Sequence, residues 1–185
     1  MYLIISGTNR IGSTTLKVAR EYQRLLKEKF ITASLLSLEG VNLLSRDRAF
    51  EQIENELLIP SDHYIFVLPE YNGSFPGALK LLFDTGKSHT LWWHKKALLV
   101  GVSTGRAGNL RGMDHLAGVL NHVKVTVFHN QLPISSVDKL MNEEGHFTDQ
   151  NTLDAINQQL EEFIKWTGTV IGHNVDPNQA SSYND

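Results

Sequence analysis

A strand-forming run, a glycine-containing loop and a helix-forming run follow one another in the segment YLIISGTNRIGSTT, residues 2–15, and the residues just after it. Residues 2–6 are apolar and rich in isoleucine, as in a short buried strand. Beyond the loop, apolar side chains recur at helical spacing and predict an amphipathic helix: Leu16, Ala19, Tyr22 and Leu26. A strand that passes through a loop directly into a helix is the first half of a βαβ unit, so this segment predicts an α/β fold.

The same alternation continues along the chain. Further runs of strand-forming composition lie at residues 32–38, 63–69, 97–103 and 123–129. Two later segments carry apolar stripes at helical spacing: Met113, Leu116, Ala117 and Leu120, then Leu153, Ile156, Leu160 and Phe163. We therefore expect a doubly wound five-stranded parallel sheet with helices on both faces and a ligand beyond the carboxyl ends of the strands. Spacing alone leaves open which of the two common strand orders the sheet adopts.

One domain is expected, because no internal repeat is visible and 185 residues suffice for a single hydrophobic core. We predict that this domain spans residues 1–173 and that residues 174–185 form a polar, flexible tail. Residues 133–149 contain Pro133, two serines and the acidic stretch Asn-Glu-Glu-Gly-His-Phe, so they predict a loop before the last helix.

Composition excludes several classes of protein. The sequence has no cysteine, which rules out disulfides, thiolate metal sites and cysteine nucleophiles and is typical of a reducing compartment. Its eight histidines lack metal-binding spacing, so no metal is expected. The first residues do not resemble a signal peptide and no apolar run approaches a membrane span, so we expect a cytoplasmic protein. With a net charge of −3 and no basic stripe, neither nucleic acid nor a membrane is an expected partner.

The first loop has the residues of a phosphate-binding site. It combines glycines with one arginine, Arg10, and with successive hydroxyls on Ser13, Thr14 and Thr15. Unpaired backbone N–H groups and the positive end of the helix dipole meet there, and guanidinium and hydroxyl donors would complete the shell of a phosphate. The alternative is an ordinary capped helix with Ser13 or Thr14 as its N-cap.

Two other nucleotide-binding motifs are not satisfied by this loop. A Walker A loop needs a lysine where this chain has Ser13, and the dinucleotide-binding motif needs a second glycine where it has Asn9. A phosphomonoester therefore fits the loop better than a triphosphate or a pyrophosphate.

Two more loops of unusual composition follow predicted strands. Residues 69–77, PEYNGSFPG, contain two prolines and two glycines, and their Tyr71 and Asn72 offer an aromatic surface and an amide to a planar ligand. Residues 103–109, STGRAGN, are small enough for backbone N–H groups to approach a ligand closely. Structural turns are the alternative for each loop, but all three are expected at the same edge of the sheet.

These motifs resemble the NADPH-dependent FMN reductases, which include bacterial azo-, quinone- and chromate-reducing enzymes. The first loop is similar to the motif Gly-Ser-x-Arg-x-x-Ser-x-Asn of that family, and the third to Ser-Thr-Gly-Arg-x-Gly-Gly. The second loop agrees with Pro-Glu-Tyr-Asn-x-Ser-x-Pro-Gly-x-Leu-Lys at every fixed position from Pro69 to Lys80. The resemblance covers about residues 2–166.

By position, the resemblance implies FMN-binding residues in all three loops. The residues around the phosphate would be Thr8, Arg10, Ser13 and Thr15. Those beside the isoalloxazine and the ribityl chain would be Pro69, Glu70, Tyr71 and Asn72, and those at the pyrimidine edge Ser103, Thr104, Gly105 and Gly108. Three positions depart from the family pattern and put the strength of FMN binding in question: Thr8 for serine, Thr15 for asparagine and Asn109 for the last glycine.

The resemblance also implies a flavodoxin-like strand order, 2-1-3-4-5, and a homodimer, or a tetramer, with FMN near the interface. It implies hydride transfer from NADPH or NADH to FMN and then electron transfer to a flavin, quinone, azo compound or metal oxyanion. Because the cofactor carries this chemistry, no catalytic side chain is expected. A flavodoxin-type electron carrier and a regulatory or scaffold protein without FMN remain alternatives. Trp92 and Trp93 would shield a flavin face, meet a partner or pack in the core.

Overall fold

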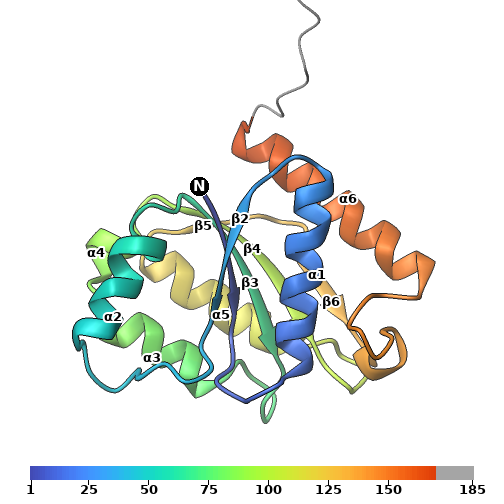
Figure 1. The fold of residues 1–185 in the computed structure, drawn as a ribbon, viewed down its shortest axis with the longest axis horizontal. Coiled ribbons are helices and arrows are strands. Elements are labelled where there is room, and N and C mark those ends of the chain that lie inside the picture. Colours follow the sequence, from blue (N-terminus) through green and yellow to red (C-terminus); the bar gives the residue numbers. More distant parts are fainter. Residues whose placement is uncertain (170–185) are drawn as a thin grey trace, which may run out of the picture.

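The computed structural model of the protein describes residues 1–169, and the tail predicted at 174–185 lies outside them. Its centre is a parallel sheet of six strands in the order β2-β1-β3-β4-β5, with β6 also pairing with β4 (Figure 1). The strands are β1 (Tyr2–Ser6), β2 (Ala33–Ser37), β3 (His63–Pro69), β4 (Lys96–Val102), β5 (Thr126–Val127) and β6 (Leu132–Ile134). The flavodoxin-like order implied by the resemblance is thus confirmed.

The fifth strand differs from its prediction. A single strand was expected over residues 123–129 and a loop over 133–149, whereas the structure divides the edge into two short strands, β5 and β6. β5 pairs with the beginning of β4, at Lys96 and Ala97, and β6 pairs with its end, at residues 100–102. The first two residues of the loop predicted at 133–149 therefore belong to strand β6.

A buried glutamine fills the gap between these two edge strands. The side-chain amide of Gln159 donates to the carbonyl oxygens of Leu99, at 3.2 Å, and Asn130, at 2.8 Å. Its own carbonyl oxygen accepts from the hydroxyl of Tyr22 at 2.8 Å. The amide replaces the strand–strand hydrogen bond that an uninterrupted fifth strand would have made, so the buried Leu99 carbonyl stays paired.

Helices cover both faces of the sheet. On one face lie α1 (Thr14–Glu28) and α6 (Gln150–Thr167), and the remaining helices lie on the other (Figure 1). These are α2 (Arg48–Ile53), which continues into a π-helical turn at Glu54–Leu58, then α3 (Gly77–Thr85), α4 (Ser88–Leu91) and α5 (Leu110–His122). A 3₁₀ turn at Val137–Lys139 follows β6. None of the described helices combines the length and the apolar composition that crossing a bilayer requires.

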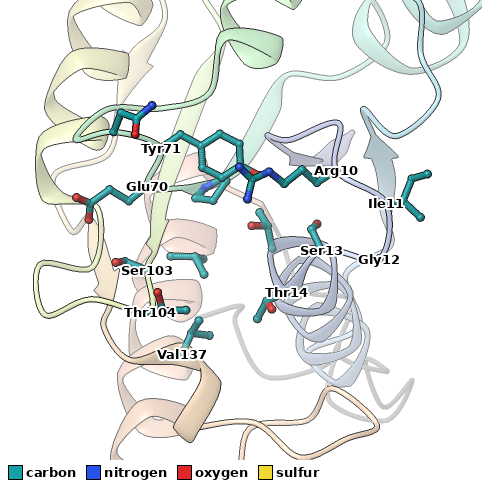
Figure 2. A pocket seen from close by; sticks show the side chains of 14 residues that line it. Arg10, Ile11, Gly12, Ser13, Thr14, Glu70, Tyr71, Ser103, Thr104 and Val137 are labelled. Atoms are coloured by element: carbon teal, nitrogen blue, oxygen red, sulfur yellow. The ribbon is translucent and has the colours of Figure 1, made fainter.

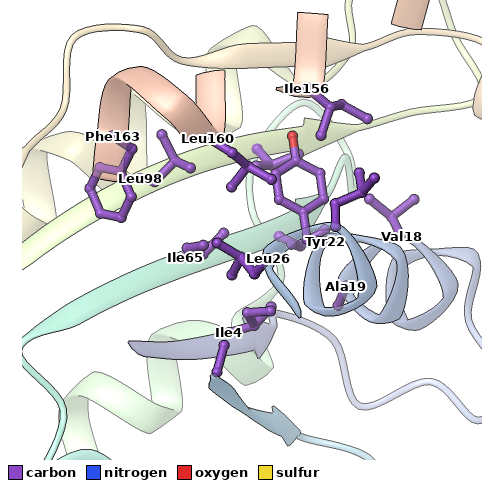
Figure 3. Close-up of a cluster of buried hydrophobic side chains, with 14 of the residues drawn as sticks. Ile4, Val18, Ala19, Tyr22, Leu26, Ile65, Leu98, Ile156, Leu160 and Phe163 are labelled. Atoms are coloured by element: carbon purple, nitrogen blue, oxygen red, sulfur yellow. The ribbon is translucent and has the colours of Figure 1, made fainter. Parts of the chain in front are cut away.

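The predicted helical stripes form the interior. Along α1, Ala19, Tyr22 and Leu26 pack on the sheet together with the stripe of α6, as Figure 3 shows for Tyr22, Leu160 and Phe163, and Leu16 is also buried. The stripe of α5 packs on the opposite face, where Met113, Leu116 and Leu120 are fully buried. The sheet is therefore covered by one apolar layer on each face. The loops that follow the strands lie at its carboxyl edge.

Trp92 belongs to the core. It is completely buried, and its ring centroid lies 4.5 Å from that of Phe83 and 5.4 Å from that of Tyr64. Trp93 is 40% exposed, and the ammonium group of Lys124 lies 3.5 Å from its ring centroid. Of the three roles considered for this segment, the structure thus assigns packing to Trp92.

Candidate functional site

A cavity of about 500 Å³ lies beyond the carboxyl ends of β1, β3 and β4, as expected for a doubly wound sheet (Figure 2). All three predicted loops contribute to it. Its lining consists of Arg10, Ile11, Gly12, Ser13, Thr14, Thr15, Pro69, Glu70, Tyr71, Asn72, Val102, Ser103, Thr104 and Val137. Ten of the thirteen predicted cofactor-binding residues are therefore in the lining, and Thr8, Gly105 and Gly108 are not.

The first loop presents backbone N–H groups to this cavity. Ser13 is the N-cap of α1, and its side-chain oxygen accepts from the Leu16 N–H at 3.1 Å. Within the part of the chain that the structure describes, the N–H groups of Ser13, Thr14 and Thr15 have no acceptor. Because α1 has fifteen residues and carries no acidic side chain in its first turn, its positive end favours an anion, and just before it the Gly12 N–H donates to the Glu39 carboxylate at 3.3 Å.

The second loop is a tight turn at the end of β3. Tyr71 and Ser74 exchange two backbone hydrogen bonds, of 2.9 and 3.1 Å. The two residues between them, Asn72 and Gly73, have φ angles of +52° and +76°, as a type I′ turn requires and as the Asn-Gly pair favours. The N–H of Glu70 donates to the Val102 carbonyl at 2.9 Å, so the turn is fixed to the end of β4.

Two side chains of the first loop meet Tyr71 of the second. The side-chain hydroxyls of Thr8 and Tyr71 are 2.7 Å apart, and the guanidinium carbon of Arg10 lies 4.0 Å from the ring centroid of Tyr71 (Figure 2). Thr8 is only 1% exposed, so the structure places it behind Tyr71 and not in the cavity lining. Among the described residues that line the cavity, Arg10 is the only lysine or arginine.

The third loop lines the cavity with its first two residues, Ser103 and Thr104, while its glycines have structural roles. The N–H of Gly105 donates to the side chain of Ser103 at 2.9 Å. Gly108 has a φ of +55°, and a Cβ atom there would lie 2.6 Å from the Cβ of Pro133. Gly108 thus permits close contact with β6, which explains its absence from the lining.

Asn109, one of the three departures from the family pattern, points away from the cavity. It is buried in a left-handed conformation with a φ of +63°, which asparagine tolerates better than most residues. Its side-chain amide donates to the Leu68 carbonyl at 3.0 Å and so joins the third loop to β3. A Cβ on Gly112 would lie 2.0 Å from the side-chain oxygen of Asn109, so this arrangement needs the glycine.

Four lining residues were not predicted. Ile11 and Gly12 belong to the first loop between predicted positions, and Val102 is the last residue of β4. Val137 lies in the 3₁₀ turn after β6, and its N–H donates to the Ser103 carbonyl at 3.1 Å. Nothing in the local sequence indicates that Val137 reaches the cavity, because its position depends on the pairing of β6.

The lining fits FMN. At one side, the N–H groups of Ser13, Thr14 and Thr15 and the guanidinium group of Arg10 can donate hydrogen bonds to a phosphomonoester. At the other, the Tyr71 turn and the backbone of Ser103 and Thr104 border a space of suitable volume for a planar ring system. Glu70 carries the only carboxylate among the lining residues in residues 1–169.

A 2-1-3-4-5 parallel sheet whose first strand leads through a loop at the cavity into a helix N-terminus defines a flavodoxin-like protein. Residues 2–139 match the family model described as NADPH-dependent FMN reductase, and the chain belongs to that family. It is therefore an oxidoreductase of the NAD(P)H-dependent FMN reductase type, with FMN as its cofactor and a nicotinamide nucleotide as its electron donor.

Similar proteins come from several bacteria. An NAD(P)H-dependent FMN reductase of Pseudomonas aeruginosa is 27% identical, over 91% of this chain and 95% of its own length. A 2-hydroxy-1,4-benzoquinone reductase of a Burkholderia species is 23% identical, over 88% of this chain and 93% of its own. Among solved structures, the flavoenzyme NAD(P)H:(acceptor) oxidoreductase FerB of Paracoccus denitrificans has a TM-score of 0.73 at 20% identity, covering 90% of this chain and 96% of its own. The last comparison supports the fold.

Proposed function

We propose that the chain catalyses electron transfer from NADPH or NADH, through FMN, to a quinone. The observation that carries the proposal is the cavity, which extends from the unpaired N–H groups at the start of α1 to an open space between the Tyr71 turn and the third loop. The similar benzoquinone reductase of Burkholderia supports a quinone as the acceptor class. A quinone is planar and can enter the same space as a nicotinamide ring.

The residues of the three loops bind and orient FMN in this proposal. The N–H groups of Ser13, Thr14 and Thr15 bind the phosphate, with Arg10 as the cationic partner. When bound, FMN would accept a hydride from the nicotinamide and pass electrons to the quinone. No side chain needs to transfer a proton as a general acid or base, so we assign none as catalytic.

The hydrogen bonds between the loops keep this arrangement rigid. The backbone N–H of Glu70 donates to the Val102 carbonyl, and the side-chain amide of Asn109 donates to the Leu68 carbonyl. The side-chain hydroxyls of Thr8 and Tyr71 are also hydrogen-bonded to each other. The second and third loops are thereby held to strands of the sheet, and the first loop to the second. Such prior ordering lowers the entropy lost when a ligand binds.

The colour of the purified protein tests the proposal. We expect a yellow protein that bleaches when NADPH is added without oxygen and regains its colour when 1,4-benzoquinone follows. A yellow protein that neither nucleotide bleaches would instead be an electron carrier, and a protein that binds no FMN would be a regulatory or scaffold protein. Parallel assays with an azo dye and with chromate would identify a different acceptor if the quinone fails.

A homodimer, or a tetramer, remains a prediction that rests on the family resemblance. Trp92 is buried within the subunit and so does not contact a partner, whereas Trp93 of the same segment is 40% exposed. Light scattering of the FMN-loaded protein at micromolar concentration checks the prediction, and a monomer would contradict it.

A further inference from the structure

The Asn72-Gly73 turn, whose first residue lines the cavity, contacts the first turns of α5. The side-chain oxygen of Ser74 lies 2.9 Å from Nδ1 of His115. The guanidinium group of Arg111 lies against Gly73, where an added Cβ would be 2.9 Å from Nη1. Asn72, the residue before Gly73, lines the cavity. Arg111, His115 and Ser74 therefore form one polar cluster beside the Asn72-Gly73 turn, outside the cavity lining, and His115 also lines a second hollow with Lys80 and Asp84.

The guanidinium group of Arg111 and the imidazole ring of His115 are available to a ligand. Arg111 and His115 are four residues apart on α5, so they lie on one face of the helix, and both are exposed. In the described part of the chain, neither forms an ion pair with a carboxylate, including Asp114 on the same helix. The second ring nitrogen of His115 likewise has no partner among the described residues.

We propose that Arg111, His115 and Ser74 form a phosphate subsite that binds the 2′-phosphate of NADPH and makes the enzyme prefer NADPH over NADH. The proposal rests on the proposed function, since it concerns the electron donor of the same cavity. Arginine suits this role because its planar group can donate two parallel hydrogen bonds to a phosphate. NADH has a hydroxyl in place of the 2′-phosphate and gains nothing from the cluster.

Binding of adenosine 2′,5′-bisphosphate to the FMN-loaded protein tests the subsite without turnover. Bound FMN occupies the N–H groups of the first loop, so the probe reports on this cluster. Calorimetry should show that this probe binds more tightly than adenosine 5′-monophosphate or inorganic phosphate. In Arg111→Gln the loss of charge-assisted hydrogen bonds should weaken binding of the bisphosphate about tenfold or more.

Two further variants sharpen the test. Arg111→Lys keeps the charge but loses the paired donors, so it should retain part of the affinity. Arg20→Gln removes an exposed arginine of α1 and is the matched control, whose affinity for the bisphosphate should equal that of the unchanged protein. In steady-state assays, the ratio of KM for NADPH to KM for NADH should rise in Arg111→Gln and not in Arg20→Gln.

The outcomes separate this inference from the proposed function. If the bisphosphate binds no better than the monophosphate, or if Arg111→Gln binds it as well as Arg20→Gln does, the subsite is refuted while FMN reduction by either nucleotide still upholds the proposed function. If neither nucleotide reduces the bound FMN, the proposed function itself fails.

Discussion

The guanidinium carbon of Arg10 lies 4.0 Å from the ring centroid of Tyr71, so an arginine of the cavity lining stacks on the aromatic residue of the opposite loop. Thr8, two residues before Arg10, bonds to the hydroxyl of the same tyrosine. Two loops that lie about sixty residues apart in the sequence thus form one wall of the site. A change in either loop is expected to affect the other.

Arg10→Ala should weaken FMN binding without a comparable effect on riboflavin, which lacks the phosphate. Charge-assisted hydrogen bonds contribute about 1.5–3 kcal/mol each, which corresponds to about a tenfold to a hundredfold change in Kd. Fluorescence titration of the apoprotein with both flavins measures the contrast, with Arg20→Ala as control. Equal weakening for both flavins would mean that Arg10 acts by holding Tyr71, and an unchanged Kd would place the phosphate elsewhere.

The Thr8–Tyr71 hydrogen bond should contribute to the free energy of unfolding. Tyr71→Phe and Thr8→Val each remove one hydroxyl, and each should cost about 0.5–1.5 kcal/mol. Urea unfolding of both single variants and the double variant measures the coupling between them. We expect the double variant to be less destabilised than the sum of the single variants, because the same bond is lost in each. Strict additivity would show that the two hydroxyls act independently.

Gly108→Ala should destabilise the protein, whereas Gly118→Ala should not. At Gly108, alanine must adopt a positive φ, at about 1–2 kcal/mol, and its Cβ meets Pro133, so overpacking adds about 1–3 kcal/mol. At Gly118, within α5, a Cβ would have no neighbour within 4 Å, and alanine favours the helix by about 0.5–1 kcal/mol. Thermal unfolding of the two variants should therefore shift in opposite directions.

The buried carboxylate of Glu21 should make the protein sensitive to acid. Burial alone would raise the pKa of Glu21, but hydrogen bonds and charges from Arg24 and His146 outweigh it and hold this pKa below its usual value. The stabilisation is present above the unfolded-state pKa of glutamate and is lost as the pH falls through the lower, folded-state pKa.

Unfolding free energies measured between neutral and acidic pH check the role of Glu21. Glu21→Gln should be less stable than the unchanged protein at neutral pH, and the difference should narrow as the pH falls, because the carboxylate is then protonated. Glu56→Gln, at an exposed glutamate of the π-helical turn, is the control. A constant difference at all pH values would rule out a contribution from the charge of Glu21.

Steady-state oxidation of NADPH should give parallel lines in double-reciprocal plots at several quinone concentrations. One cavity serves the electron donor and the acceptor in turn, so the first product must leave before the acceptor enters. Intersecting lines would show that both substrates are bound together and would contradict a shared site.

The sequence alone determined the α/β class, the first four strands, the helices α1, α5 and α6 and the three loops around the cavity, but not the divided fifth strand. These features follow from local patterns, because apolar stripes at a helical or strand period record which face is buried. The glycines and hydroxyl side chains after residue 6 likewise predict a helix N-terminus that suits a phosphate. The strand order came from the family resemblance and is confirmed by the sheet.

Tertiary structure decided where single residues of these loops point. Thr8 lies behind Tyr71, Gly108 packs on Pro133 and Asn109 bonds to Leu68, although the motif alone would place the first two at the cofactor. Val137 reaches the cavity only because the edge of the sheet is divided. Each position depends on a partner that is distant in the sequence, and local periodicity carries no information about such partners.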